Sequence, residues 1–243
     1  MKPSSVPPRT PSTLSASVHH RLDMYASAAS AAGVGILALG QPAEAKVVYT
    51  PAHNWLPVNQ YFYLDLNHDG RTVFRFFLQS RRSSQSNAAY DLTVEPGIGP
   101  GAKNAVYSYK SANASHCGAF STLFCAAALP KGVKVGPNSP FPAAKSLFMF
   151  ESAWEEDCSW VFGQWLDVTK QAFLGLKFVI NGEVHYGWAR MGHISHRGPV
   201  KVELTGYAYE TTPNKPIVTG KTKGTDVITV GPATLGMLAQ GRK

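Results

Sequence analysis

The sequence lacks the short motifs that mark several large enzyme classes. Its 243 residues contain no G-x-S-x-G element, no P-loop and no dinucleotide-binding fingerprint. None of its three cysteines lies in a C-x-x-C pair, the spacing typical of zinc knuckles. The sequence also has no internal repeat and no amphipathic helix of convincing length. It therefore offers no catalytic signature, and whether the protein is an enzyme stays open, with a non-enzymatic role favoured.

Acidic residues are also few. The chain has 15 acidic residues against 23 lysines and arginines, which gives a formal net charge of +8. A basic surface attracts nucleic acid, anionic lipid or acidic polysaccharide. The cations are scattered along the chain and no nucleic-acid-binding motif accompanies them, so we expect a solvated basic face and no nucleic-acid partner.

Residues 1–45 have the three parts of a secretory signal peptide. A polar, slightly basic stretch over residues 1–23 precedes an apolar run, Met24–Gly40, that is rich in alanine and serine. Ala43-Glu44-Ala45 then forms an Ala-x-Ala site, and cleavage is expected before Lys46. An uncleaved membrane anchor is the alternative, although the run is short for a span of about 20 residues. The leader predicts a secreted or surface-exposed protein.

The strongest structural signal is the stretch from residue 173 to residue 191, where two alternating runs flank Asn181-Gly182. This dipeptide is typical of a two-residue type I′ turn and predicts a β-hairpin. With that turn, Gly175 faces Trp188 across the hairpin. The glycine then lies opposite a large apolar side chain, which we expect to fill the space above it.

The remaining pattern predicts an all-β fold. The 22 glycines and 17 prolines indicate many turns, and residues 112–129 allow no single assignment. We expect an antiparallel β-sandwich or jelly roll over residues 46–224, preceded by an N-terminal signal helix, with a flexible or sorting-like tail over residues 225–243. Besides the hairpin, short alternating runs predict strands at 46–51, 58–66, 72–78, 90–94, 105–109, 146–150 and 200–210.

Three stretches carry a family resemblance: the leader, Gly182-Glu-Val-His-Tyr-Gly-Trp188, and Tyr207-Ala-Tyr-Glu210. In these places the chain resembles uncharacterised secreted bacterial proteins that often carry PEP-CTERM-like sorting tails. Pro232-Ala-Thr-Leu-Gly236 resembles the start of such a tail and Arg242-Lys243 its basic end, although the Pro-Glu-Pro signature itself is absent. The resemblance implies an extracellular or cell-surface bacterial protein with a β-sandwich fold, and no particular activity.

Asp65-x-Asn67-x-Asp69-Gly70 matches the first half of an EF-hand-like calcium loop. The spacing places three oxygen-bearing side chains around one point, and the glycine permits a sharp turn. The second half of the motif is absent, because Phe76 stands where a bidentate glutamate should close the shell. The alternative is an Asx-rich turn in a β-hairpin. Calcium is therefore a possible cofactor, with Asp65, Asn67 and Asp69 as its candidate ligands.

Cys117, Cys125 and Cys158 form an odd set for an oxidising compartment. A Cys117–Cys125 disulfide is the favoured pairing, and pairing of either residue with Cys158 is an alternative. Zinc bound by the cysteines and His116 is a further alternative. A catalytic cysteine is disfavoured, because no family signature surrounds any of the three.

Trp154-Glu-Glu-Asp-Cys-Ser-Trp160 combines carboxylates with aromatic rings. Glycosidases place two carboxyl groups around a sugar, and the faces of tryptophan rings suit the apolar faces of sugars. Trp154 and Trp160 are therefore candidates for ligand stacking. The alternative is a solvated acidic loop.

These observations favour a secreted or surface-exposed binding or structural component, with polysaccharide or cell-surface matrix as its partner. Any membrane contact is expected only through the leader or the tail. The alternative is a carbohydrate-binding module or carbohydrate-active enzyme on a jelly roll. A solvent-exposed row of tryptophans on one sheet face would support that alternative, and burial of Trp160, Trp165 and Trp188 would count against it.

Overall fold

The computed structural model describes residues 46–82, 88–97, 103–116, 119–155, 158–168, 171–195 and 200–231. The predicted signal peptide and the end of the predicted sorting-like tail lie outside these residues. Apart from one 3-10 turn, the regular secondary structure of the described residues is all strand, and the all-β prediction is confirmed. No helix within these ranges has the length and apolar character to cross a membrane.

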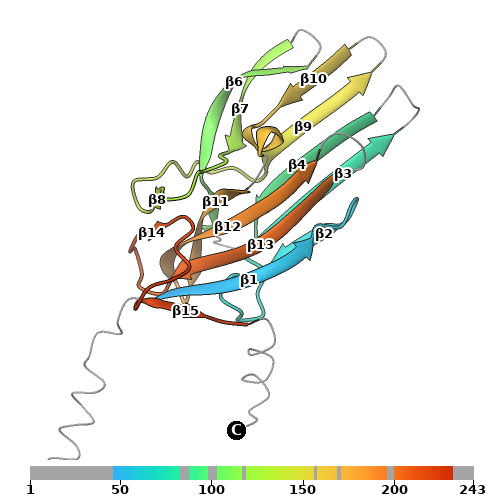
Figure 1. The fold of residues 1–243 in the computed structure, drawn as a ribbon. Helices are drawn as coiled ribbons and strands as arrows, with labels where there is room; N and C mark the ends of the chain where they lie inside the picture. The colour runs from blue at the N-terminus through green and yellow to red at the C-terminus, as the bar shows by residue number, and fades with distance from the viewer. Residues whose placement is uncertain are drawn as a thin grey trace, which may run out of the picture. The chain divides into compact units, whose positions relative to one another are not determined.

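The described elements are strands and a single 3-10 turn (Figure 1). In chain order they are β1 (Val47–Trp55), β2 (Tyr61–Leu64), β3 (Phe74–Arg82), β4 (Ala88–Pro96), β5 (Ala105–Val106), β6 (Ser108–His116), β7 (Ala119–Ala126), β8 (Lys134–Val135), β9 (Leu147–Glu155), β10 (Cys158–Phe162), η1 (Gln164–Asp167), β11 (Gln171–Ile180), β12 (Glu183–Ser195), β13 (Lys201–Glu210), β14 (Ile217–Val218) and β15 (Val227–Thr229).

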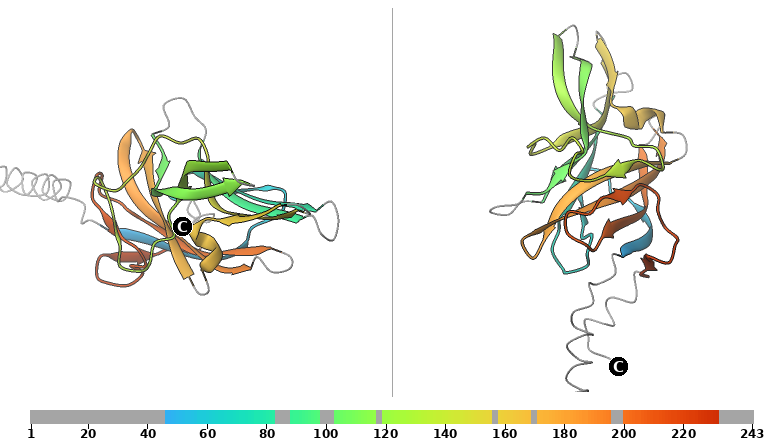
Figure 2. Two further views of the ribbon diagram at one scale, coloured as in Figure 1. Left: turned by 90° about the horizontal axis from the view of Figure 1, so that it is seen from above. Right: turned by 90° about the vertical axis from the view of Figure 1, so that its left-hand side faces the viewer.

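These strands form two large sheets that make two layers (Figures 1 and 2). The first sheet has the order β15-β1-β13-β12-β11-β5. The second has the order β2-β3-β4-β9-β7-β6, and β10 pairs with the end of β9. Among the described strands, only β1–β15 and β7–β9 pair in parallel. A small pair, β8 and β14, adds a third sheet.

The main core lies between the two large sheets. Phe74, Phe76 and Leu78 alternate along β3 and are fully buried, because residues two apart in a strand share one face. Leu174 and Phe178 of β11 belong to the same buried cluster. Each such side chain contributes about 1.5–3 kcal/mol relative to an exposed position. The inner faces of both sheets are therefore committed to packing. The outer face of the first sheet is also partly covered, because Phe173 and Trp188 are buried there against Leu129, Val135 and Ile217.

The predicted hairpin is confirmed in type and register. β11 and β12 pair through Ile180–Glu183 at the turn, and Gly175 pairs with Trp188. Asn181 and Gly182 have φ values of 50° and 87°, as a type I′ turn requires. The atoms nearest to a Cβ at position 175 belong to Tyr107, Leu129 and Val135, not to the register partner Trp188. A Cβ at position 175 would meet Tyr107 at 2.9 Å, because residues of the covering layer pack directly on the strand.

Three regions fold differently from the simplest interpretation of the sequence. The ambiguous residues 112–129 contribute most of the β6–β7 pair. The stretch around Trp154–Trp160 contributes to the strands β9 and β10. A solvated acidic loop was one interpretation of its sequence. Val227–Thr229, assigned above to the tail, pairs in parallel with β1. The first two segments are rich in small, polar or acidic residues, so their strand character comes from their partners. Val227–Thr229 consists of β-branched residues, which favour strands.

Candidate functional site

The large tryptophans do not form an exposed row. Trp165 and Trp188 are fully buried, and Trp165 donates its Nε1 hydrogen to the Ala126 carbonyl at 3.0 Å. Trp160 is half-buried and packs against a small cluster that includes Cys125 and Phe162. The side chain of Trp154 lies outside the described residues. The burial of two of the three tryptophans counts against a tryptophan-based sugar site.

Exposed aromatic rings gather instead on the outer face of the second sheet, at its β2 edge. Tyr61 and Tyr63 of β2 are 38% and 59% exposed. Tyr61 pairs with Phe77 of β3, and their ring centroids lie 4.8 Å apart, while those of the two tyrosines lie 6.1 Å apart. Directly opposed residues share one face of a sheet. We call Tyr61, Tyr63 and Phe77 the tyrosine face.

An ion pair fixes one ring of the tyrosine face. Arg75 pairs in register with Tyr63 on one side and with Glu95 of β4 on the other. Its Nε donates a hydrogen bond to Glu95 Oε2 at 2.6 Å, and its guanidinium carbon lies 4.4 Å from the centroid of the Tyr61 ring. A cation over an aromatic face is attracted by the ring's quadrupole. The guanidinium therefore covers part of one ring and restrains it.

Two buried carboxyl groups lie further along the same outer face. Asp91 of β4 and Glu151 of β9 are direct register partners, and each is only 5% exposed. Burial raises the pKa of Asp91 to about 6; the Arg81 guanidinium, 3.3 Å away, opposes this rise and Glu151 adds to it. Because both residues are almost fully covered, we interpret the pair as structural. It was missed from the sequence because its members lie on different strands.

The predicted calcium loop is a tight turn whose first carboxylate is already occupied by backbone donors. Asp65 accepts hydrogen bonds from the backbone nitrogens of His68 at 2.7 Å and Gly70 at 2.8 Å. Asp69 accepts one from the Arg71 nitrogen at 2.8 Å. The buried Oδ1 of Asn67 has no hydrogen-bond partner. These bonds fit the Asx-turn alternative, and calcium binding stays a prediction.

His68 points away from the loop and into the domain. Its Nε2 lies 3.1 Å from Thr50 Oγ1 and 3.2 Å from Tyr207 Oη. Burial lowers the pKa of His68, and the nearby Asp65 carboxylate opposes that shift. Among the described residues, no group of three or more histidines, cysteines or acidic residues is placed to hold a metal ion.

The cysteines are only partly described. Cys125 is buried with a free thiol in β7, where it pairs with Tyr109 of β6. Burial raises the pKa of this thiol, and its hydrogen bond with Tyr109 opposes that shift. Cys117 and the side chains of His116 and Cys158 lie outside the described residues. The disulfide therefore stays a prediction. In the structure the thiol of Cys125 forms a hydrogen bond with Tyr109.

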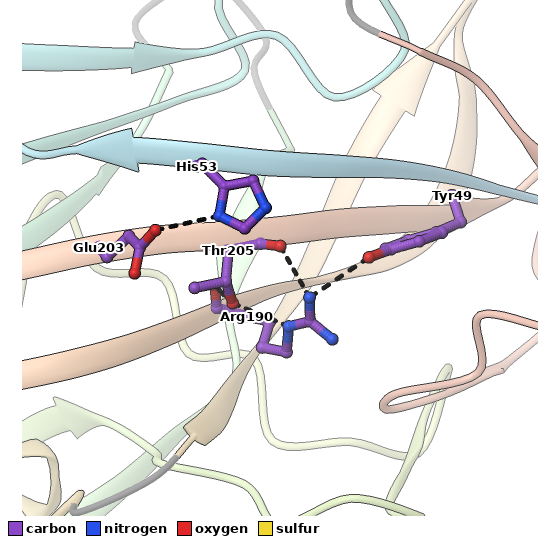
Figure 3. Close-up of polar contacts among 5 residues, drawn as sticks. All are labelled: Tyr49, His53, Arg190, Glu203 and Thr205. Carbon is purple, nitrogen blue, oxygen red and sulfur yellow. Dashed lines mark hydrogen bonds and ion pairs between the residues drawn. The ribbon is translucent and has the colours of Figure 1, made fainter.

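A polar cluster joins three strands of the first sheet where their register shifts (Figure 3). Arg190 of β12 donates to the Thr205 carbonyl at 2.7 Å, to Thr205 Oγ1 at 2.8 Å and to Tyr49 Oη at 3.3 Å. His53 Nδ1 lies 3.2 Å from Glu203 Oε1. A bulge frees backbone groups from the ladder, and the arginine satisfies one of them. The cluster therefore stabilises the bulge. No sequence motif predicts this cluster.

The chain matches no protein-family model, no curated protein and no solved structure. Any functional conclusion must therefore come from its own residues.

Proposed function

We propose that this protein is a secreted or cell-surface, non-enzymatic β-sandwich that binds polysaccharide on its tyrosine face. The observation that supports the proposal is the exposure of Tyr61 and Tyr63 side by side on one sheet face. The leader and the family resemblance support the location, and the same resemblance offers the tail as a means of retention at the bacterial surface.

The chemistry of the tyrosine face suits a sugar chain. Aromatic rings present a large apolar surface at low conformational cost, and their hydroxyl groups can still reach water or a ligand. The apolar faces of sugar rings can lie on such a surface. Successive rings 6.1 Å apart offer two neighbouring contact points along one chain. β2 is the edge strand of the second sheet, so no other described strand borders the tyrosine face on that side.

A binding role fits this face better than glycoside hydrolysis does. Hydrolysis by the usual mechanism needs two carboxyl groups that can reach the sugar from either side. Asp91 and Glu151 lie side by side on neighbouring strands, but each is 95% buried beneath its neighbours. Glu95 is partly exposed, yet it is paired with Arg75. We therefore assign no catalytic residue.

Affinity electrophoresis of the purified protein in gels that contain single polysaccharides tests the proposal, together with a glycan array. We expect one or more polysaccharides to retard the wild type, and a Tyr61→Ala/Tyr63→Ala variant to migrate as in a gel without polysaccharide. Trp55→Ala is the matched control, because Trp55 is 54% exposed but lies on the first sheet.

The tyrosine variant should lose about 1 kcal/mol of stability, because Tyr61 gives up its contacts with Phe77 and Arg75. Urea denaturation shows that all three proteins are folded under the conditions of the gel, so a loss of binding is not a loss of fold. Binding that survives the double tyrosine substitution would contradict the proposal. So would the absence of retardation across the whole panel.

A further inference from the structure

A groove of about 900 Å³ shares two residues, Arg75 and Glu95, with the border of the tyrosine face. Its other walls come from the segment before β5, from the loop before β9 and from Lys177 of β11. It thus lies where the second sheet, the first sheet and a loop meet. Arg75, which lines the groove, is the register partner of Tyr63. A polymer chain that lies on Tyr63 therefore reaches the groove when it extends across Arg75.

The lining of the groove is strongly basic. Arg75, Lys103, Lys145 and Lys177 contribute four positive charges, and Glu95 contributes the one negative charge. Arg75 and Glu95 neutralise each other through their ion pair. Lys177 Nζ lies 5.6 Å from the centroid of the Phe141 ring. A cleft lined by one sign of charge concentrates the field and attracts ions of the opposite sign.

Two of these lysines are open to a ligand. Lys103 and Lys145 are exposed, and within the ranges that the structure describes neither forms an ion pair with a carboxylate. Asn104, which also lines the groove, is already engaged: its side chain donates to the Val73 carbonyl at 3.2 Å and accepts from the Val179 nitrogen at 3.2 Å. The lysines, rather than the amide, are therefore the groups left for recognition.

The groove also offers a ring against which a sugar can lie. Phe141 is half-buried and stacks on Tyr186 with centroids 6.0 Å apart, so its position is fixed from behind. Tyr107 supports it edge-on at 6.1 Å. A supported aromatic ring with Lys177 near its face, in a groove lined by further lysines, is suited to a ligand unit that has both an apolar face and a negative charge.

We infer that the groove binds the anionic group of an acidic polysaccharide, a uronate carboxylate or a sulfate, in the same chain whose neighbouring sugars lie on the tyrosine face. This inference rests on the proposed function and adds the class of its ligand. Charge complementarity selects the occupant, because three cations remain after the Arg75–Glu95 pair is set aside. Non-specific nucleic-acid binding uses a positive groove that tracks many phosphates, whereas these lysines gather around one short groove.

Matched polymers provide the test. Hydroxyethyl cellulose and carboxymethyl cellulose differ in the carboxylate, and dextran and dextran sulfate differ in the sulfate. We expect the wild type to bind at least one acidic polymer about tenfold more tightly than its neutral counterpart at about 0.1 M salt, a difference of about 1.4 kcal/mol. The pair that shows the difference distinguishes a carboxylate ligand from a sulfate ligand.

Charge-matched variants separate the groove from general basicity. Lys103→Gln/Lys145→Gln/Lys177→Gln should lose most of the preference for the acidic polymer and show a weaker dependence of affinity on salt. Lys131→Gln/Lys134→Gln/Lys201→Gln removes the same charge from exposed positions outside the groove lining and should change affinity less than about twofold. Replacing the half-buried Lys177 could disturb the fold. The double variant Lys103→Gln/Lys145→Gln keeps Lys177, so a loss of the preference in this variant is not caused by misfolding.

The possible failures are distinguishable. Two outcomes overturn the inference about the groove: equal losses of affinity in the groove and control variants, or no preference for any acidic polymer. In either case, binding that depends on Tyr61 and Tyr63 still supports the proposed function. Failure of all neutral and acidic polymers to bind overturns both. The wild type could instead bind a single-stranded oligonucleotide more tightly than the acidic polymers and lose that binding in the groove variant. This result would identify nucleic acid as the ligand of the groove and overturn the inference.

Discussion

The guanidinium group of Arg75 contacts two partners at once: its carbon lies 4.4 Å from the centroid of the Tyr61 ring, and its Nε donates to Glu95 at 2.6 Å. A planar guanidinium can stack on a ring while its edge donates to a carboxylate. The three residues come from three adjacent strands. Tyr61 is therefore held in place before any ligand arrives, which lowers the entropic cost of binding.

Replacing Arg75 tests this arrangement. Arg75→Ala should destabilise the fold by about 1 kcal/mol, because it removes a partly buried ion pair and a cation–π contact. It should also weaken polysaccharide binding, since the Tyr61 ring loses its restraint. Urea denaturation and affinity electrophoresis give the two readouts. Arg75→Lys should recover part of the stability and less of the binding, and full recovery of both would contradict a role for the planar group.

The buried Asp91 should make stability depend on pH. Its pKa rises from an ordinary 3.8 to about 6 in the folded state, so the fold binds this proton more tightly than the unfolded chain does. The resulting stabilisation is complete below about pH 4 and is lost as the pH rises through 6, with a total of about 2–3 kcal/mol. Asp91→Asn cannot titrate, so it should gain stability relative to the wild type between pH 4 and pH 7.

Urea denaturation of both proteins at several pH values measures that difference, and other titrating groups largely cancel in it. The groups that face Asp91 are Arg81 and Glu151. Glu151→Gln removes the like charge, so it should lower the Asp91 pKa and reduce the effect. Parallel stability profiles for wild type and Asp91→Asn would contradict the raised pKa.

The turn at Asp65 should need its carboxylate whether or not calcium is present. Asp65→Ala leaves the backbone nitrogens of His68 and Gly70 without their acceptor. We expect a loss of about 1.5–3 kcal/mol in a buffer that contains chelator, the range for hydrogen bonds to a charged group. Thermal unfolding measures this loss of stability. Asp226→Ala is the control, because it removes an acidic residue from a partly exposed ion pair with Lys221.

Calcium would add a separate effect to that turn. If the loop holds the ion, millimolar calcium raises the melting temperature of the wild type and leaves that of Asp65→Ala unchanged. An equal response of the two proteins to calcium would rule out a site built on Asp65. No response in the wild type at millimolar calcium would rule out the calcium prediction as a whole.

Two hairpin glycines should respond to alanine for different reasons. A methyl group at Gly175 would lie 2.9 Å from Tyr107 Cβ, so Gly175→Ala should cost about 1–3 kcal/mol through overpacking. Gly182 has open space around it but a φ of 87°, so Gly182→Ala should cost only about 1 kcal/mol through backbone strain. Gly182→Asn should recover most of that loss. A larger loss at Gly182 than at Gly175 would contradict this assignment.

The parts of the fold that the sequence predicted are those fixed by local chemistry. The turn at Asn181-Gly182 sets every pair in β11–β12 without information from elsewhere in the chain. β13 could be predicted because its hydrophobic alternation is clear over ten residues. β6 and β7 could not, since serine, alanine and threonine carry little periodic signal and their pairing partner defines them as strands.

The tyrosine face was missed for a related reason. In Tyr61-Phe-Tyr-Leu64 both faces of the strand carry apolar residues, so alternation cannot tell which side faces the core. The structure decides it: Phe62 and Leu64 pack inward and the tyrosines face outward. Tryptophan drew attention as the better stacking residue, but the largest apolar rings are also the most useful in a core. The groove combines residues from distant segments, which no spacing rule could bring together.

The parallel pair of β1 and β15 has a mechanical consequence. Val47 and Val227 lie side by side, and hydrogen bonds from Val47 to Asp226 and from Val230 to Tyr49 close the pair at both ends. A pull on the tail after Val230, against a domain held elsewhere, acts along β15 and parallel to its partner β1. It loads these bonds together in shear instead of opening them one by one. If the tail holds the protein at the cell surface while the bound ligand holds the tyrosine face, the β1–β15 pair is the first contact to resist the force.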